Sequence, residues 1–268
     1  MNNLKIFCMC LDNNYLNIVK KLNYIPVGLK NNDFSDDWLR DNTLDNISEK
    51  NPYYGEYSFY YWYWKNLLKH KKENEWIGFC SYRELWGESK EILNKDSINS
   101  LLKDLPDEWN DYEAIIGEPT ILFRPKLLKI IKHGKIASLR NFKEIFKSRI
   151  SIRYHFDMYH GNGYLDKAIE LLPEKDINDF KSYVKNNSAF NQGNMFISRS
   201  SKIINLYFTE VFDWLKKCEK LFGFNLKGYN TIRMYTFLAE RFLPYWFNKY
   251  TRCLEWPVVY CDINKNNK

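Results

Sequence analysis

Side chains that could bind a ligand rich in hydroxyl groups gather in the polar loop between residues 41 and 51. Its candidate ligand-binding members are Asp41, Asp45, Asn46, Ser48 and Asn51. Such side chains compete with the backbone for hydrogen bonds, so they disfavour regular structure, but they offer many donors and acceptors to a hydroxyl-rich ligand. A solvated surface loop would have the same composition. The residues C-terminal to the loop therefore decide between the two interpretations.

A helix rich in aromatic residues is predicted directly after this loop. Asn51-Pro52 is typical of a helix start, because Asn is a preferred N-cap and Pro at the next position has no donor to lose. From Tyr54 to Leu68, apolar residues recur at helical spacing and fill most other positions as well, which predicts a buried helix. Glu56 lies in the first turn. Its carboxylate suits a helix N-terminus, and it is also our first candidate for a catalytic base.

A short apolar run, residues 76–82, is predicted to be a strand covered on both faces. It leads directly into Arg83 and Glu84. In open α/β sheets, ligands bind beyond the carboxyl ends of the strands. We therefore expect the polar loop, Glu56, Arg83 and Glu84 to meet in one crevice, with Glu84 as the second candidate base and Arg83 as a substrate-binding residue.

Two histidines and an aspartate lie within six residues further along the chain. His155, Asp157 and His160 could ligate Zn, Mn or Fe, or supply a general base. The histidines are five residues apart, so they share a helix face imperfectly. We retain Asp157 and His160 as candidate catalytic residues. Asp166, which comes after a Gly-Asn-Gly turn, is predicted to cap the next helix and to be structural.

The segment 229–242 is predicted to be a helix that carries polar residues in an aromatic setting. These residues are Arg233, Glu240 and Arg241. A buried Glu–Arg ion pair is one interpretation, and phosphate binding by Arg233 or Arg241 is the other. Pro244 is expected to end this helix, because proline lacks the backbone donor and collides with the preceding turn.

The remaining pattern is that of an α/β fold. A strand at 4–11, a helix at 15–22 and a strand at 24–29 open the chain, which favours parallel pairing. Further helices are predicted at 97–105, 126–132, 176–185 and 201–222, with a strand at 112–117 and a polar turn before an apolar strand at 190–197. The basic residues of 126–132 form either a solvated face or a contact with anionic lipid.

Composition and charge narrow the class of protein. The 268 residues carry 40 Lys and Arg against 33 Asp and Glu, a net charge of +7, without a nucleic-acid-binding signature. This charge fits an anionic small ligand, such as a nucleotide diphosphate, or an anionic membrane surface. The six cysteines are scattered without a CxxC pair, so we expect reduced thiols. No apolar run would span a bilayer and the N-terminus lacks signal-peptide features, so we expect a cytoplasmic protein.

Several of these segments, taken in order, resemble a family of bacterial glycosyltransferases. The matching motifs are D-N-x-x-D-N-I-S-x-K-N at 41–51, Y-x-E at 54–56, Y-W-x-W-K-N at 61–66, I-G-x-x-x-Y-R at 77–83, FNQGNMFI at 190–197 and R-x-x-x-F-L-A-E-R-F at 233–242. The family occurs in capsule and lipopolysaccharide gene clusters and is catalogued as domain of unknown function 4422. Because the motifs span nearly the whole chain in register, the resemblance is specific.

Three departures from the family pattern stand out. Leu44 takes the place of the usual Gly, and Tyr57-Ser58 that of the usual Leu-Thr. Ser81 and Glu84 replace the His and the second Arg of the usual H-Y-R-R. The last exchange falls on the strand end that carries a candidate base.

The resemblance implies a GT-A-like mixed sheet flanked by helices in a single domain, residues 1–268. Residues 1–120 would bind the nucleotide sugar and residues 121–268 the acceptor. The implied partners are a nucleotide-sugar donor and a glycan or lipid-linked glycan acceptor, with peripheral contact with the inner membrane and no nucleic acid. Beyond the loop, the implied substrate-binding residues are Cys10, Gly28, Lys65, Tyr82, Arg83, Asn191, Gln192, Asn194, Arg233 and Arg241. An Asn-Gly hairpin turn is the alternative for 190–197.

Transfer from such a donor requires stabilisation of the nucleoside diphosphate and, if the reaction inverts, a base. The chain lacks a D-x-D after 76–82, where many GT-A enzymes hold Mn. Asp41 and Asp45 are alternative ligands for Mn or Mg, and Lys65, Arg83 and Arg241 are cations that would replace a metal. Two further classes stay open: a non-catalytic nucleotide- or glycan-binding relative, and a phosphate-dependent enzyme on a related scaffold.

Overall fold

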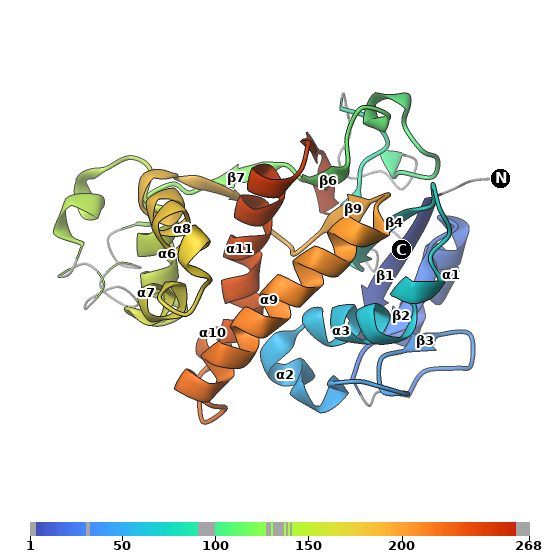
Figure 1. The fold of residues 1–268 in the computed structure, drawn as a ribbon, viewed down its shortest axis with the longest axis horizontal. Helices are drawn as coiled ribbons and strands as arrows, with labels where there is room; N and C mark the ends of the chain where they lie inside the picture. Colours follow the sequence, from blue (N-terminus) through green and yellow to red (C-terminus); the bar gives the residue numbers. More distant parts are fainter. Residues whose placement is uncertain are drawn as a thin grey trace. The chain divides into compact units, whose positions relative to one another are not determined.

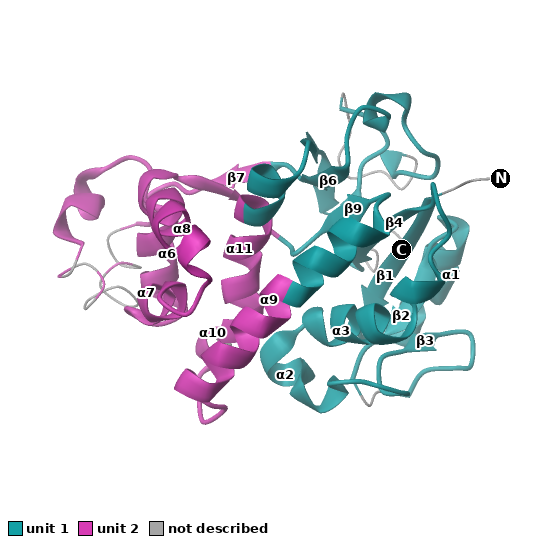
Figure 2. Ribbon diagram, in the orientation of Figure 1, with its two compact units in different colours: residues 1–118, 193–209, 246–268 teal, residues 119–192, 210–245 magenta. Residues whose placement is uncertain are grey.

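The chain forms two compact units, shown in different colours in Figure 2. The computed structural model describes residues 4–30, 33–90, 100–126, 130, 137, 139 and 141–260. Unit 1 comprises residues 1–118, 193–209 and 246–268, and unit 2 comprises residues 119–192 and 210–245. Each unit is therefore assembled from segments that are distant in sequence. None of the described helices is long and apolar enough to cross a membrane.

Unit 1 is built on a mixed sheet (Figure 1). Its strands are β1 (Leu4–Cys10), β2 (Ile25–Gly28), β3 (Leu39–Arg40), β4 (Trp76–Ser81), β5 (Glu84–Trp86), β6 (Ala114–Gly117), β9 (Phe196–Ser198), β10 (Cys253–Trp256) and β11 (Val258–Tyr260). The described strands are ordered β10-β6-β9-β4-β1-β2-β3, and β5 pairs with β4 and β11. β4, β1, β2 and β3 run parallel, whereas β9 is antiparallel to both of its neighbours. The sheet confirms the predicted α/β class and the parallel opening of the chain.

Both faces of this sheet are covered, which explains the continuous apolar runs of β1 and β4. On one face, Phe7 of β1 packs against the rings of Phe59 and Tyr63, with centroids 5.5 and 5.1 Å away. On the other, Ile6 and Cys8 belong to a second apolar core. Within the described residues, and besides α9 and α11, unit 1 includes the helical segments η1 (Asn13–Tyr15), α1 (Leu16–Lys21), η2 (Ser48–Lys50), α2 (Asn51–Tyr54), α3 (Tyr57–Asn66), η3 (Leu68–His70) and η5 (Asp107–Trp109).

The aromatic helix predicted from Asn51 onward is broken into two. α2 ends at Tyr54, Gly55 adopts φ 54° and ψ −127°, and α3 comes next with Glu56 as its N-cap. Asn51 is the first residue of α2 rather than an N-cap, and its Nδ2 donates to the Gly55 carbonyl at 2.9 Å. The apolar periodicity concealed the break, because the residues on either side of Gly55 keep helical spacing.

Unit 2 is mainly helical. Its elements are the strands β7 (Pro119–Ile121) and β8 (Ala189–Asn191) and the helices η6 (Phe142–Phe146), α6 (Ile152–Tyr159), α7 (Tyr164–Ile169), α8 (Glu174–Asn186) and α10 (Tyr229–Ile232). The long helices α9 (Ser201–Phe222) and α11 (Met234–Tyr250) each begin in one unit and end in the other. The core of unit 2 contains Trp214, whose ring centroid lies 6.2 Å from that of Phe180 and 5.0 Å from that of Phe242.

The helix predicted at 201–222 is confirmed, because it coincides with α9. The helices predicted at 97–105 and 126–132 have a different outcome. The helix predicted at 97–105 is wrong beyond Ser100, which is in 3-10 conformation, because Leu101 forms a β-bridge with Gly87 and residues 102–105 are not helical. Residues 97–99, like most of the helix predicted at 126–132, lie outside the described residues.

The prediction that Pro244 ends its helix is also wrong. α11 continues through Pro244 to Tyr250. Beyond the proline, Trp246 and Phe247 are buried, and their ring centroids lie 5.1 and 4.9 Å from that of Tyr207 in unit 1. Burial of two such rings outweighs the cost of about 3 kcal/mol for proline inside a helix.

Candidate functional site

The carboxyl ends of the four parallel strands meet at one edge of the unit 1 sheet. Cys10 at the end of β1 pairs with Gly28 at the end of β2, and Gly28 pairs with Arg40 at the end of β3. Asp41 comes directly after β3, and the backbone N–H of Tyr82, just after β4, donates to the Met9 carbonyl at 3.0 Å. The predicted substrate-binding residues Cys10, Gly28, Asp41 and Tyr82 therefore lie at this edge.

Glu84 lies opposite Ser81, across the tight turn formed by Tyr82 and Arg83. The Ser81 hydroxyl donates to Glu84 Oε2 at 3.4 Å, so the two departures from the family's H-Y-R-R pattern are in contact. Gly193 approaches the same carboxylate. A Cβ added to Gly193, whose φ is +92°, would lie 2.7 Å from Glu84 Oε2. The backbone can come this close to Glu84 because residue 193 has no side chain.

Tyr60 of α3 joins both candidate bases to the segment after β8. Its buried hydroxyl donates to the Asn194 carbonyl at 2.6 Å. Burial raises the pKa of Tyr60 well above its ordinary value, and the carboxylates of Glu56 and Glu84 raise it further. The charges of Glu56 and Glu84 thus both influence the hydroxyl that bonds the Asn194 carbonyl. Sequence reasoning assigned Tyr60 to the apolar face of the helix and missed this role.

Asp41 and Asn51 belong to a buried network that shapes the turn before Glu56. The Ser58 hydroxyl donates to Asp41 Oδ2 at 2.6 Å, and Asn51 Nδ2 donates to Ser58 Oγ at 2.8 Å. Burial raises the pKa of Asp41, and its side chain is fully enclosed. These contacts give Asp41 and Asn51 a supporting function, since both fix the start of α3 and thereby the position of Glu56.

Asn46 and Ser48 form hydrogen bonds within the polar loop. Asn46 Nδ2 donates to the Leu44 carbonyl at 2.9 Å, and the Ser48 hydroxyl donates to Asn46 Oδ1 at 2.8 Å. Leu44, which replaces the usual Gly, has φ 52° and a side chain that is 77% exposed. The structure thus keeps at Leu44 the left-handed backbone that a glycine would adopt without strain.

The loop carboxylates do not fit a shared divalent-metal site. Asp41 is buried against Ser58, whereas Asp45 is exposed and interacts with the Tyr61 hydroxyl. Within the described part of the chain, no three His, Cys, Asp or Glu side chains are grouped as a metal site requires. Two predicted cations lie in unit 1 instead: Lys65, with its Nζ 3.4 Å from the Trp64 ring centroid, and exposed Arg83, stacked 5.0 Å from the Tyr82 ring.

In unit 2, Arg241 is buried in a cluster with Glu240, His155 and His160. It forms an ion pair with Glu240, as one interpretation of the sequence predicted. Its Nη2 donates to His155 Nδ1 at 3.2 Å and to His160 Nε2 at 3.3 Å. Because His160 Nδ1 faces the Asn230 carbonyl at 3.1 Å, this nitrogen carries the ring proton and Nε2 is the acceptor.

Both histidines of this cluster are held neutral. Burial, followed by the charge of Arg241, lowers the pKa of His155 to about 3 and lowers that of His160 well below its ordinary value. The lone pair that His160 would need as a base already accepts from Arg241, which is itself 1% exposed. The geometry therefore favours structural functions for His160 and Arg241 over base catalysis and phosphate binding.

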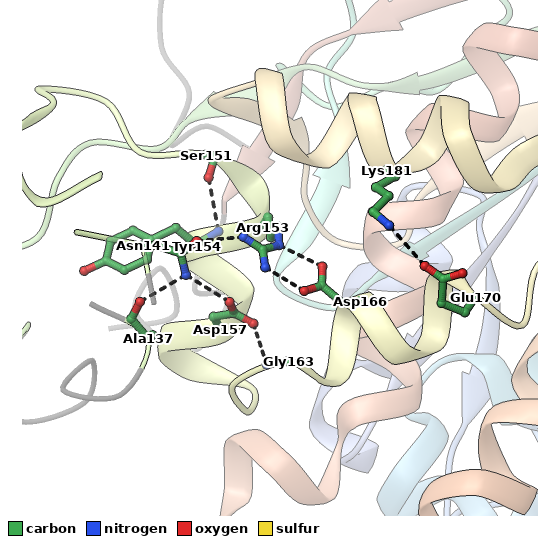
Figure 3. A network of polar contacts seen from close by, with 10 residues as sticks. All are labelled: Ala137, Asn141, Ser151, Arg153, Tyr154, Asp157, Gly163, Asp166, Glu170 and Lys181. Atoms are coloured by element: carbon green, nitrogen blue, oxygen red, sulfur yellow. Dashed lines mark hydrogen bonds and ion pairs between the residues drawn. The ribbon is translucent and has the colours of Figure 1, made fainter. Parts of the chain in front are cut away.

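Asp157 and Asp166 also serve the fold of unit 2 (Figure 3). Asp157 accepts from the Gly163 backbone at 2.8 Å and from Asn141 Nδ2 at 3.2 Å, and burial raises its pKa. Asp166 does not cap α7, whose N-cap is Gly163 in the left-handed conformation without a side-chain cap. Asp166 instead pairs with Arg153 through two hydrogen bonds of 2.7 and 2.6 Å. The predicted cap is thus replaced by an ion pair.

The FNQGNMFI segment passes from unit 2 into unit 1 and is not a hairpin. β8 pairs with β7, so that Asn191 lies opposite Pro119, while β9 pairs with β4 and β6. Asn191 is buried, and Gln192 is partly exposed. Gly193 and Asn194 both have positive φ, 92° and 54°, which turns the chain toward Glu84. Arg233 lies between α10 and α11 in unit 2.

Comparison with known proteins assigns the chain to a family. The sequence profile described as "Domain of unknown function (DUF4422)" matches residues 5–251, so the chain belongs to this family. The structure is similar to a solved structure described as the WbbM bifunctional glycosyltransferase in its apo form, with a TM-score of 0.67 and 18% identity over 97% of this chain. This chain spans 46% of that one. The fold is therefore GT-A-like. No curated protein sequence matches.

Proposed function

We propose that this protein is a glycosyltransferase that moves a sugar from a nucleotide-sugar donor to a growing capsular or lipopolysaccharide glycan of a bacterium. The observation that supports this most strongly is the position of Glu56 and Glu84. Glu84 comes after a parallel strand, at the edge where α/β sheets bind ligands, and Gly193 closely approaches it. Glu56 is the N-cap of α3, whose Tyr60 hydroxyl donates to the carbonyl of Asn194, the residue after Gly193. Similarity to the fold of a known glycosyltransferase supports the same reaction class.

In the proposed reaction, an acceptor hydroxyl attacks the anomeric carbon of the donor sugar. The bond between that carbon and the diphosphate oxygen breaks, and the nucleoside diphosphate leaves with the electron pair. Glu84 or Glu56 takes the hydroxyl proton as general base. Partly exposed Lys65 and exposed Arg83 are the cations proposed to stabilise the leaving diphosphate. No step is assigned to Asp41 or Asp45, because their present contacts do not form a metal site.

We also propose that the enzyme acts in the cytoplasm, at the inner face of the membrane. Unit 2 exposes large aromatic side chains: Phe123 by 66%, Phe142 by 61% and Phe146 by 70%. The Arg149 guanidinium lies 6.0 Å from the Phe123 ring. Exposed aromatic rings beside cations are suited to an anionic lipid surface, which would carry a lipid-linked acceptor.

The test is calorimetric titration of the protein with UDP, GDP and CDP, each with and without Mn²⁺. We expect one of them to bind without metal, and Arg83→Gln to weaken it by about tenfold, as loss of one charge-assisted contact predicts. The matched control is Arg252→Gln at another exposed arginine. Binding solely in the presence of Mn²⁺ would favour Asp41 and Asp45 as metal ligands after all. If none binds under either condition, the proposal fails.

The alternative is a non-catalytic nucleotide- or glycan-binding relative. The exchange of a His and an Arg for Ser81 and Glu84 at the strand end is the observation that favours it. Such a protein would bind a nucleoside diphosphate but release none from any donor sugar. Release of inorganic phosphate instead of nucleoside diphosphate would identify a phosphate-dependent enzyme.

A further inference from the structure

Tyr260, which was not among the candidate site residues, lies beside Glu84 in the sheet of unit 1. β11 pairs antiparallel with β5, and this pairing places Tyr260 directly opposite Glu84. Residues that are directly opposite in an antiparallel pair share one face of the sheet, with their Cβ atoms about 4.5–5.5 Å apart. The Tyr260 ring and the Glu84 carboxylate are therefore neighbours at the sheet edge where the candidate site lies.

Two other segments of unit 1 contact Glu84. Ser81, at the end of β4, is its partner in the pairing of β4 with β5, and the Ser81 hydroxyl donates to Glu84 Oε2 at 3.4 Å. Gly193 lies so close that an added Cβ would be 2.7 Å from the same oxygen. The Glu84 side chain is thus flanked by β4, β11 and the Gly193 backbone, yet it stays partly exposed. A carboxylate held in this way is preorganised for a ligand that approaches from solvent.

The Tyr260 side chain is 53% exposed, whereas Tyr57 and Tyr60 of the same unit are buried. Single exposed rings are common and need no ligand. This ring, however, lies next to a partly exposed carboxylate at the edge where α/β sheets bind ligands. An apolar surface with a few polar groups beside it is the usual composition of a small-molecule site.

The combination of an aromatic ring and a carboxylate suits a sugar. One face of a sugar ring consists of C–H groups, which pack against an aromatic face, and its rim carries hydroxyls, which donate to carboxylate oxygens. Tyr260 provides the aromatic face and Glu84 the acceptor oxygens. A nucleobase also stacks on tyrosine, but in a nucleotide it is tied to phosphates, which the charge of Glu84 repels.

The charge of Glu84 also restricts the kind of sugar. This charge reaches the surrounding side chains, since it contributes to the raised pKa of Tyr60. A uronic acid stacked on Tyr260 would bring a second carboxylate close to Glu84, and like charges at short distance repel. Arg83 precedes Glu84, but its guanidinium stacks on the Tyr82 ring, 5.0 Å from the centroid. The surroundings of Tyr260 therefore favour a neutral sugar.

We propose that Tyr260 binds the acceptor sugar by stacking on its ring, and that this sugar is neutral rather than acidic. In this arrangement a hydroxyl of the stacked sugar lies beside Glu84. Glu84 takes the hydroxyl proton as general base, while the hydroxyl oxygen forms the new bond to the donor sugar and the nucleoside diphosphate leaves. The assignment to the acceptor rests on the proposed function, whereas binding of a neutral sugar at Tyr260 does not.

The test is saturation-transfer NMR of the full chain with the methyl glycosides of glucose, galactose and mannose and with methyl glucuronide. At least one neutral glycoside should bind, and Tyr260→Ala should weaken it by about tenfold, as loss of a ring contact predicts. Tyr260→Phe should stay within about twofold of wild type, because stacking uses the ring and not the hydroxyl. The matched control is Phe123→Ala, which removes a ring that is 66% exposed in unit 2 and should change the affinity by less than about twofold.

Methyl glucuronide tests the restriction to neutral sugars. It should bind about tenfold more weakly than methyl glucoside, and Glu84→Gln should narrow this gap because the repulsion is removed. Equal binding of glucuronide and glucoside to wild type would overturn the preference for a neutral sugar.

The remaining outcomes separate the sugar site from the proposed function. Equal affinity in wild type and Tyr260→Ala, or no binding of a neutral glycoside to wild type, would overturn the site at Tyr260. A loss in Tyr260→Phe as large as that in Tyr260→Ala would overturn stacking. Tyr260→Ala should still bind the nucleoside diphosphate that wild type binds. If wild type binds a neutral glycoside through Tyr260 but no nucleoside diphosphate, the proposed function fails while the sugar site stands.

Discussion

Each unit holds a polar cluster with a candidate base, and the two clusters differ in charge and exposure. In unit 1, Glu56 and Glu84 are partly exposed, and their charges add to the burial that raises the pKa of Tyr60. In unit 2, His160 is 6% exposed, is held neutral, and accepts from Arg241 through the nitrogen that a base would use. Both clusters contain residue types that are common in catalysis. In the unit 2 cluster, however, Glu240 already pairs with buried Arg241, and both histidines already accept hydrogen bonds from it.

Residue type alone therefore does not identify a site in this protein. A buried guanidinium needs acceptors, and two neutral imidazoles and a carboxylate supply them. The same histidines in the sequence suggested a metal site or a base. A functional residue is distinguished from a supporting one by whether its reactive atom still faces solvent or ligand.

The largest effect is expected from Glu84→Gln. It should lower turnover by about 100- to 10,000-fold, the usual contribution of a general base, and change the unfolding free energy by less than about 0.5 kcal/mol. Release of nucleoside diphosphate gives turnover, and Glu88→Gln at a nearby exposed site is the control. A loss in Glu56→Gln alone would transfer the role to Glu56, and full activity in both variants would exclude both residues as bases.

Arg241→Met should destabilise the protein by about 3–5 kcal/mol, because it breaks the buried ion pair with Glu240 and removes the donor to His155 and His160. Urea unfolding measures this, with Arg252→Met at an exposed site as the control. A loss below about 1 kcal/mol, together with weaker nucleotide binding, would make Arg241 a ligand-binding residue after all.

Acid should destabilise unit 2 through its neutral histidines. The pKa of His155 is about 3 in the folded protein and about 6.5 when unfolded. The unfolded chain therefore binds more protons between these values, and the stabilisation present above pH 6.5 is lost as the pH falls toward 3. His155→Asn should flatten unfolding free energy against pH by up to about 1.4 kcal/mol per pH unit in this window.

The difference between wild type and His155→Asn isolates this effect from carboxyls such as Asp41 and Asp157, whose raised pKa acts in the opposite direction. His70→Asn, at an exposed histidine, is the control. Identical pH profiles for wild type and His155→Asn would show that His155 is not held neutral by its surroundings.

Gly193→Ala tests whether the close approach to Glu84 matters. The positive φ and the contact with Glu84 Oε2 should together reduce stability by about 1–3 kcal/mol, and displacement of Glu84 should lower turnover. Gly223→Ala shares the positive φ, but nothing lies within 4 Å of the added Cβ, so it measures backbone strain alone. Equal stability and full turnover in both variants would separate Gly193 from the site.

The smallest effect is expected from Leu44→Gly. Left-handed backbone at a non-glycine residue costs about 1–2 kcal/mol, and a glycine recovers part of this after its larger unfolded-state entropy is subtracted. Because the Leu44 side chain is 77% exposed, little burial is lost. In Leu44→Gly, the free energy of unfolding measured by thermal unfolding should rise by up to about 1 kcal/mol. In the control Leu206→Gly, whose residue lies in α9 and is 43% exposed, it should fall by about 1 kcal/mol.

Local sequence patterns predicted more of the fold than of the candidate site. Apolar runs predicted β1, β2 and β4 and placed Glu84 just beyond the end of β4, whereas the family resemblance, not the spacing, implied Cys10 and Gly28. The hydrogen bond from Tyr60 to Asn194 joins residues 134 positions apart, so no local sequence pattern could predict it. The contact of Ser81 with Glu84 is local and joins the two residues that depart from the family's H-Y-R-R pattern, but that departure did not by itself predict the contact.

The most direct test of the contrast between the clusters is hydrogen exchange of the full chain with and without a saturating nucleoside diphosphate. We expect protection of the backbone at the carboxyl ends of β1, β2 and β4, in peptides that cover residues 8–12, 26–30 and 80–85. We expect no change in peptides that cover 152–160 and 237–243. Protection confined to the second set would contradict this assignment and place the ligand at the His–Arg cluster.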